Sequence, residues 1–289
     1  MTRMAGMPHM HLTTMHPGPA ATDRKAMGKN EMMTFGGHLE ALRRMLFRVI
    51  ISVAAWGILL FCFKERLFDI VLAPHDADFC IYRLAQRLVD LCGMDVDVGA
   101  FDVQLINTEL ASQFTAHIKV SACLGLLLAS PYVVYELYRF VSPALYDNER
   151  RASVWVVVSA YALFIIGVLV NYFVIFPISF RFLATYQVSD AVANTIALSS
   201  YISTFLMLSF MLGVVFELPV VAYFLARAGI ARSSALRRGR KVALLVILVI
   251  AAIVTPPDVF SQIIVTVPLY ALYELSIVIV GRCERRRDA

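Results

Sequence analysis

The chain has 289 residues and a formal net charge of +5, and 60% of its residues are apolar while only 16% are charged. Its mean hydropathy of +0.73 leaves too little polar surface to cover a water-soluble globule of this size, so the composition argues against a cytosolic enzyme and predicts a membrane protein. The five cysteines form no C-x-x-C pair, and the sequence contains no nucleotide-binding, serine-hydrolase or zinc-protease motif. We therefore expect no cofactor, no metal site, no nucleic-acid partner and no enzymatic activity.

The first 33 residues differ from the rest of the chain. They contain eight of its twelve methionines and show no periodicity, so we interpret residues 1–33 as a disordered extension. Residues 34–281 form the predicted membrane domain, and residues 282–289 a basic tail. The membrane domain begins with apolar residues at helical spacing, which predict an interfacial amphipathic helix that leads into the first span: Phe35, Leu39, Leu42 and Leu46.

Six apolar runs of membrane length predict an all-α polytopic membrane protein with six transmembrane helices. They lie at residues 46–63, 118–136, 154–176, 203–224, 242–255 and 259–280. The fifth run is short: its core, Val242–Val254, reaches about 20 Å at ~1.5 Å per residue, against a hydrocarbon core of about 30 Å. Either this run is not a span or the bilayer thins around it. We favour a tight hairpin of a short fifth and a short sixth helix, with its turn at Pro256, Pro257 and Asp258.

The distribution of basic residues predicts the orientation. Six spans place both termini on one side, and 20 of the 26 lysines and arginines lie in segments on that side. The other six lie on the opposite side, five of them in residues 64–119, where nine acidic residues outnumber them. The positive-inside rule therefore predicts cytoplasmic termini. The long outer segment contains Cys80 and Cys92, which either form a disulfide in an oxidising compartment or remain two free thiols.

A single acidic residue, Glu217, lies just past the middle of the fourth span. A bare carboxylate near mid-bilayer costs about 2.5–3.5 kcal/mol on insertion scales, so we expect its side chain to be protonated, hydrogen-bonded or turned toward a polar surface. Either it serves a function or a neighbouring helix satisfies it. Pro219 removes a backbone donor close by, which predicts a bend in this helix.

Polar residues also surround the turn between the fifth and sixth spans. Asp258 is typical of a residue that caps a helix start. Gln262, one turn later, would lie within the outer leaflet, where its amide needs a partner. Glu274 lies late in the sixth span, and we expect it to pair with a cytoplasmic arginine or to extend toward the interface.

The segment Tyr135–Arg151 is aromatic and acidic, whereas the rest of the predicted cytoplasmic face is basic. Its carboxylates are suited to bind a pair of arginines through charge-assisted, bidentate bonds. Alternatively, Glu149 pairs locally with Arg150 or Arg151 at a helix start.

Four short motifs, in this order, resemble the TatC family, the core membrane subunit of the twin-arginine (Sec-independent) protein translocase. They are His38–Arg43 before the first span, Ser142–Tyr146 with Glu149–Arg151 after the second, Phe216–Pro219 in the fourth, and Thr255–Gln262 before the sixth. The resemblance implies a glove-shaped bundle of six helices in the bacterial inner membrane, with both termini in the cytoplasm.

The resemblance also implies roles for individual residues. Twin-arginine signal peptides of folded proteins would bind at the cytoplasmic face, with Glu149 as the acidic receptor and with Phe140, Leu42 and Arg43 on the same surface. The single transmembrane helices of the partner subunits TatA and TatB would dock at Glu217 and Gln262.

Two further positions match the family and two features depart from it. Pro74 matches a proline after the first span, and Asp258 matches the acid of the outer turn. The family pattern His-Leu-x-Glu-Leu-Arg has its acid one position earlier here, at Glu40, and a shift of one residue turns a helical side chain by about 100°. We therefore expect signal-peptide binding to depend on Glu149 more than on Glu40. The first outer segment is longer than in the family by an insertion near residues 76–102, to which the sequence assigns no function.

The sequence thus predicts a non-enzymatic translocase receptor, a homo-oligomer within a larger complex, whose transport is driven by the proton gradient. The alternative is an ion-coupled secondary transporter of a small solute, with Glu217 as the coupling site. No internal repeat supports that alternative. An intramembrane enzyme is disfavoured because no His, Asp or Ser pair lies at catalytic spacing within the spans.

Overall fold

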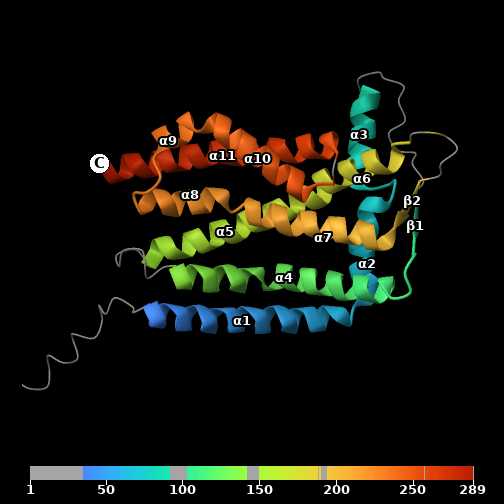
Figure 1. Cartoon of the computed structure of the whole chain (residues 1–289), viewed down its shortest axis with the longest axis horizontal. Coiled ribbons are helices and arrows are strands. Elements are labelled where there is room, and N and C mark those ends of the chain that lie inside the picture. Colours follow the sequence, from blue (N-terminus) through green and yellow to red (C-terminus); the bar gives the residue numbers. More distant parts are fainter. Residues whose placement is uncertain are drawn as a thin grey trace, which may run out of the picture. The chain divides into compact units, whose positions relative to one another are not determined.

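The computed structural model describes residues 35–91, 103–141, 150–187, 189, 194–256 and 258–288. The extension predicted at residues 1–33 lies outside this part. The chain divides at Arg43 and Arg44 into two units, and each is described by itself. Helices dominate the described residues, which confirms the predicted all-α polytopic fold (Figure 1).

Five helical segments within the described part are long and apolar enough to cross a membrane. The first belongs to α1 (Phe35–Phe61), the second to α4 (Ser112–Val141), and the last to α11 (Val259–Asp288). The third, Trp155–Thr185, joins α5 (Arg150–Val170), a π-helical turn η4 (Asn171–Ile175) and α6 (Phe176–Thr185). The fourth, Leu198–Arg227, joins α7 (Leu198–Val215) and α8 (Leu218–Arg227). The amphipathic stretch predicted from Phe35 is helical, and it forms one continuous element with the first span.

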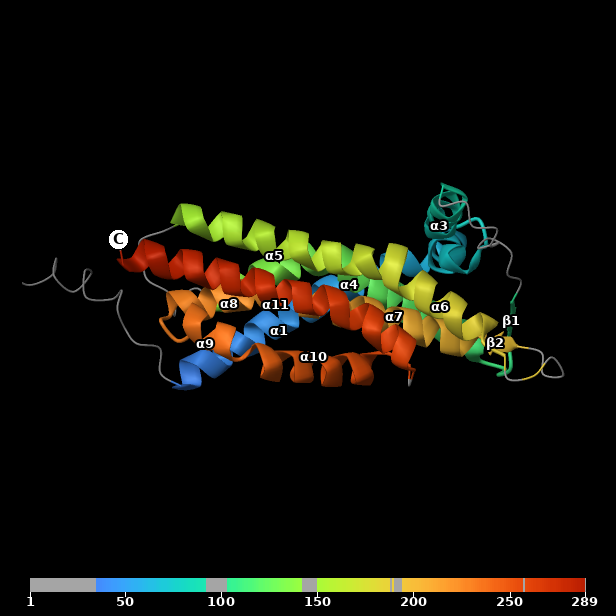
Figure 2. The same ribbon diagram turned by 90° about the horizontal axis from the view of Figure 1, so that it is seen from above.

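The predicted hairpin is present, but only one of its helices is short. Helix α10 (Arg240–Val254) has 15 residues, which span about 22 Å at ~1.5 Å per residue, and it lies beside α11 (Figure 2). The sixth helix was expected to be short, and that prediction is wrong: α11 has 30 residues and includes all but the last residue of the predicted tail. Its extension is held by Glu284, which accepts hydrogen bonds from the backbone N–H and the hydroxyl of Ser233 in α9 (Ser233–Arg238).

At one end of the bundle, short elements run across the direction of the spans. Helix α2 (Lys64–Leu72), the 3-10 turn η2 (Ala73–His75) and α3 (Cys80–Leu91) follow α1 there (Figure 1). Strands β1 (Gln104–Ile106) and β2 (Thr195–Ala197) form a parallel pair in which Leu105 lies opposite Ile196. The sequence did not predict this pair. We call this end of the bundle the strand end.

Two tyrosines from other elements bind the carboxyl end of α2, whose last carbonyl groups lack partners inside the helix, and a third binds η2 directly after it. Tyr172 donates to the carbonyl of Ile70 (2.9 Å) and Tyr201 to that of Val71 (3.0 Å). The hydroxyl of Tyr82 lies 3.2 Å from the Pro74 carbonyl oxygen and 2.8 Å from that of Pro177 in α6. Burial raises the pKa of Tyr82 well above its usual range, more than the nearby Arg181 cation lowers it, so the hydroxyl keeps its proton. Tyr82 therefore links the buried Pro74 of η2 to Pro177 of α6.

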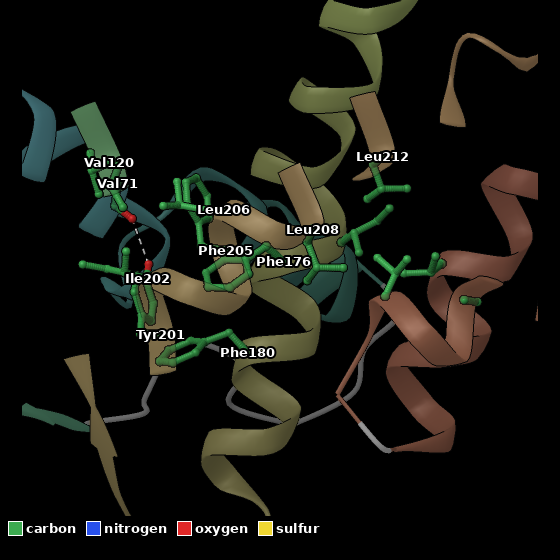
Figure 3. Close-up of a cluster of buried hydrophobic side chains, with 14 of the residues drawn as sticks. Val71, Val120, Phe176, Phe180, Tyr201, Ile202, Phe205, Leu206, Leu208 and Leu212 are labelled. Atoms are coloured by element: carbon green, nitrogen blue, oxygen red, sulfur yellow. Dashed lines mark hydrogen bonds between the residues drawn. The ribbon is translucent and has the colours of Figure 1, made fainter. Parts of the chain in front are cut away.

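The buried core includes Tyr201 and extends through α2, α4, α6 and α7. Aromatic side chains of α6 and α7 pack against α2 and α4, with Phe176, Phe180 and Tyr201 in mutual edge or stacked contact (Figure 3). Many large apolar side chains outside this cluster are exposed, including Ile58 at 71% and Trp155 at 74%. Such exposure is expected for helices whose outer faces contact lipid tails.

Replacement of Tyr201 by phenylalanine should lower the thermal stability of the protein in detergent. The substitution keeps the ring and leaves the buried carbonyl of Val71 without its donor, at a cost of about 1–3 kcal/mol. Tyr172→Phe is the matched control, because its hydrogen bond is exposed and its loss should cost less. Equal melting temperatures for Tyr201→Phe and the unaltered protein would contradict this role.

Candidate functional site

Two of the carboxylates predicted near the cytoplasmic surface, Glu40 and Glu136, already contact guanidinium groups. In the first unit, Glu40 and Arg43 form an exposed ion pair of 3.6 Å one turn apart on α1, where Leu42 is also exposed. In the second unit, Glu136 on α4 is 4% exposed, and both its oxygens lie 3.4 Å from an Nη1 nitrogen of Arg48 on α1.

Tyr132 completes the contact around Glu136. Its hydroxyl donates to Oε1 of Glu136 over 3.0 Å, from one turn earlier on α4. A buried carboxylate needs such partners to remain charged. The sequence showed the acidic segment but not the Arg48 contact, because the two residues are 88 positions apart.

The predicted receptor residue, Glu149, lies outside the described residues, as do Ser142 to Asn148. Phe140 lies half-buried in the last turn of α4. Tyr138, two residues earlier, contacts Phe224 of α8, with ring centroids 6.2 Å apart. The end of α4 that leads to Glu149 is therefore packed against α8.

Glu217 lies at a break in the fourth span. The regular pattern of helical hydrogen bonds is interrupted at Phe216 and Glu217, and a new helix, α8, begins at Leu218. Pro219 lies in the first turn of α8, where a backbone N–H has no partner within the helix, so its absence in proline costs nothing. The structure thus has a break in the helix beside Pro219, where the sequence analysis predicted a bend. The Glu217 side chain is half-buried, and its Oε1 atom is fully buried without a hydrogen-bond partner in the described part of the chain.

The close approach of α5 and α7 positions this break. Gly167 on α5 faces Phe216: a Cβ atom there would lie 2.8 Å from Cγ of Phe216 and 2.8 Å from the Leu212 carbonyl oxygen. One helical turn along each helix, Asn171 of η4 donates to the hydroxyl of Ser209 (2.8 Å), and its Oδ1 atom is buried without a partner among the described residues. The sequence analysis missed this polar pair, although an asparagine inside an apolar run is a signal for it.

At the turn before α11, the expected cap is present. Oδ1 of Asp258 accepts a 2.6 Å hydrogen bond from the backbone N–H of Ser261, while Pro256 precedes the cap and Pro257 lies outside the described residues. Gln262 finds its partner within the chain: its Nε2 donates to the Leu248 carbonyl of α10 over 3.0 Å. Gln262 therefore ties the two helices of the hairpin together.

Two other predictions concern Glu274 and the cysteines. Glu274 pairs with Arg240 at 2.8 Å and accepts a hydrogen bond from Tyr270, which confirms the expected arginine partner. Cys80 is a free, exposed thiol, so the structure lends no support to a disulfide with Cys92, which lies outside the described residues. Within the residues that the structure describes, no cluster of three or more His, Cys, Asp or Glu residues is arranged to hold a metal ion.

Two apolar grooves flank α4, and the sequence analysis did not predict them. One, of about 480 Å³, lies between α1 and α4 and includes Ile50 and Ile118. The other, of about 550 Å³, lies among α1, α4 and α7 and includes Leu126 and Met207. At the second groove Lys119 donates to the hydroxyl of Ser203 over 3.2 Å. A lysine inside an apolar run was the available signal for this position.

These features define the class of the molecule: a multi-pass helical membrane protein whose spans carry isolated polar groups at helix breaks and ends. The family model described as Sec-independent protein translocase protein (TatC) matches residues 37–268, so the chain belongs to the TatC family. It is a protein translocase component and not an enzyme.

Known relatives agree with this assignment over most of their length. The chain is 36% identical over 250 residues to the TatC protein of Desulforapulum autotrophicum, a match that covers 86% of this chain and 85% of that protein. It is 34% identical over 240 residues to the TatC protein of Escherichia coli K12, covering 83% and 85%. The crystal structure of a twin arginine translocase receptor, TatC, superposes with a TM-score of 0.69 at 30% identity, and the match covers 86% of this chain and 99% of that one.

Proposed function

We propose that this chain is the receptor subunit that binds twin-arginine signal peptides of folded proteins and exports them with TatA- and TatB-type partners, driven by the proton motive force. The observation that carries the proposal is the half-buried Glu217 at the break in the fourth span, with one carboxylate oxygen that no described residue satisfies. In a bilayer, an unpaired carboxylate oxygen favours a polar group on a neighbouring helix.

The proposed signal-peptide site depends on Glu149. Two other carboxylates near the predicted cytoplasmic surface already have guanidinium partners within the chain, since Glu40 contacts Arg43 and Glu136 contacts Arg48. Glu149 is the acid that the family resemblance marks as the receptor of an incoming arginine pair, and Phe140, Leu42 and Arg43 are the further positions of that family pattern. Planar guanidinium groups suit such a site better than the point charge of lysine.

A peptide-binding experiment tests this role. The unaltered chain should bind a signal peptide with Arg-Arg more tightly than one with Lys-Lys, and Glu149→Gln should lower the affinity for the Arg-Arg peptide about tenfold or more, because a charge-assisted hydrogen bond contributes about 1.5–3 kcal/mol. Glu40→Gln is the matched control and should have the smaller effect, since its partner Arg43 is on the same helix. Equal affinity of the unaltered chain for both peptides would contradict the receptor role.

The two grooves beside α4 support the next step of the proposal. Their apolar lining matches the apolar stretch of a signal peptide, which would lie along the spans once its arginines are bound. Partner helices would then dock at Glu217 and beside Gln262, whose amide nitrogen is held by Leu248 while its carbonyl oxygen remains an acceptor.

The proposed setting is the bacterial inner membrane with both termini in the cytoplasm, in a homo-oligomer within a larger complex. The basic residues of α9 and the start of α10 lie at the end of the bundle opposite the strand end, as the positive-inside rule requires for that orientation (Figure 1). An ion-coupled transporter of a small solute is not favoured, because the family match covers residues 37–268.

A further inference from the structure

Helix α3 lies in the insertion near residues 76–102, which the proposed function leaves without a role. It is amphipathic, and its buried face is fastened to the bundle near its start. Tyr82 is 3% exposed and contacts the carbonyl oxygens of Pro74 and Pro177, while Phe79 packs against Phe173 with ring centroids 5.9 Å apart. The first turn of α3 is thereby fixed to η2, η4 and α6.

The apolar face of α3 is wider than the part that packs against the protein. Leu84 is 52% exposed and Leu91 is 84% exposed, and their seven-residue separation puts both on one side of the helix. Arg83 and Arg87 are also exposed and border this apolar strip. Neither arginine forms an ion pair with a carboxylate elsewhere in the described residues, where Asp90 instead accepts a hydrogen bond from Gln86.

The placement of α3 indicates what contacts the strip. Its axis runs across the direction of the spans in Figure 1, and Figure 2 shows it end-on. Along the long axis of the bundle, α3 lies at the same position as the strand-end turns of α4 and α6 in both views. It projects sideways from the bundle. Interfacial amphipathic helices have this placement, at the end of the membrane-spanning segments and across their direction.

We propose that α3 is an interfacial helix that rests on the lipid leaflet at the strand end, with Leu84 and Leu91 among the acyl chains and with Arg83 and Arg87 at the phosphates of anionic headgroups. A lipid surface accounts for the exposed leucines and for the arginines beside them. The leucines would contact hydrocarbon and the arginines phosphate, at the boundary between the two. The helix then anchors η2 and the carboxyl end of α2 through Tyr82.

Depth measurements on the full chain in nanodiscs test the proposal. The native cysteines are replaced by serine, and a nitroxide is attached at Leu84→Cys, at Leu91→Cys and, as a control on the polar face, at Asp90→Cys. The ratio of collision with oxygen to collision with a water-soluble nickel chelate should be several-fold higher at positions 84 and 91 than at position 90. With phosphatidylglycerol added to phosphatidylcholine, Arg83→Gln with Arg87→Gln should lower the ratio at position 84, and in phosphatidylcholine alone it should not.

Three results would overturn the proposal. Equal ratios at positions 84, 91 and 90 in nanodiscs would show that α3 stands clear of the lipid. Shielding of positions 84 and 91 from both reagents, in nanodiscs and in detergent alike, would show that another segment of the chain covers the strip. An arginine effect that is the same with and without phosphatidylglycerol would remove the anionic headgroup as the ligand. Circular dichroism and gel filtration of each variant confirm that the labelled proteins are folded.

Discussion

Replacement of Glu217 by alanine should weaken the association with single-span partners about threefold to twentyfold without weakening the fold. An interhelical hydrogen bond within a membrane contributes about 0.6–1.7 kcal/mol, which sets the size of the expected loss. The fold should keep or gain stability, because the Glu217 side chain is half-buried at a helix break and its Oε1 atom has no partner among the residues described. Copurification with TatA- and TatB-type subunits in mild detergent measures the association, and export of a twin-arginine reporter measures its consequence.

Glu217→Gln is the control for this experiment, since an amide keeps an oxygen acceptor at the same place. It should retain most of the partner binding that Glu217→Ala loses. The opposite pattern, a large fall in melting temperature for Glu217→Ala with unchanged copurification, would show that the carboxylate serves only the fold of the chain.

Replacement of Gly167 by alanine should destabilise the contact between α5 and α7 by about 1–3 kcal/mol, as expected for overpacking of a closely packed interface. The added Cβ atom would lie 2.8 Å from the Leu212 carbonyl oxygen and 2.8 Å from Cγ of Phe216, so a helix has to move. Because Phe216 adjoins Glu217, partner copurification should fall together with the melting temperature.

Gly57→Ala is the matched control, since Gly57 also lies at a contact between two helices. A Cβ atom there would lie 3.6 Å from the Ser121 carbonyl oxygen, which is an ordinary contact. The better helix propensity of alanine should leave this variant as stable as the unaltered chain or about 1 kcal/mol more stable. Equal melting temperatures of the two variants would contradict the close approach at Gly167.

The tight α10–α11 hairpin shows which structural features local sequence patterns can predict and which they cannot. The length of an apolar run, the two prolines and an aspartate at a helix start all act within a few residues, so the sequence predicted the short α10, the turn and the Asp258 cap. The length of α11 was not predicted, because its last turns are charged and their helical state depends on the contact between Ser233 and Glu284, 51 residues apart.

The same distinction applies to the candidate site. Apolar run lengths, charge asymmetry and the Pro219 break follow from the solvation of single residues, and the sequence alone therefore determined the membrane class, the interrupted fourth span and Glu217 as an exceptional residue. Only the tertiary structure decided which groups satisfy one another: Arg48 with Glu136, Tyr201 with Val71, and Gln262 with Leu248. Hydrogen bonds between distant residues leave no periodic trace in a single sequence, because they depend on how the helices pack against one another.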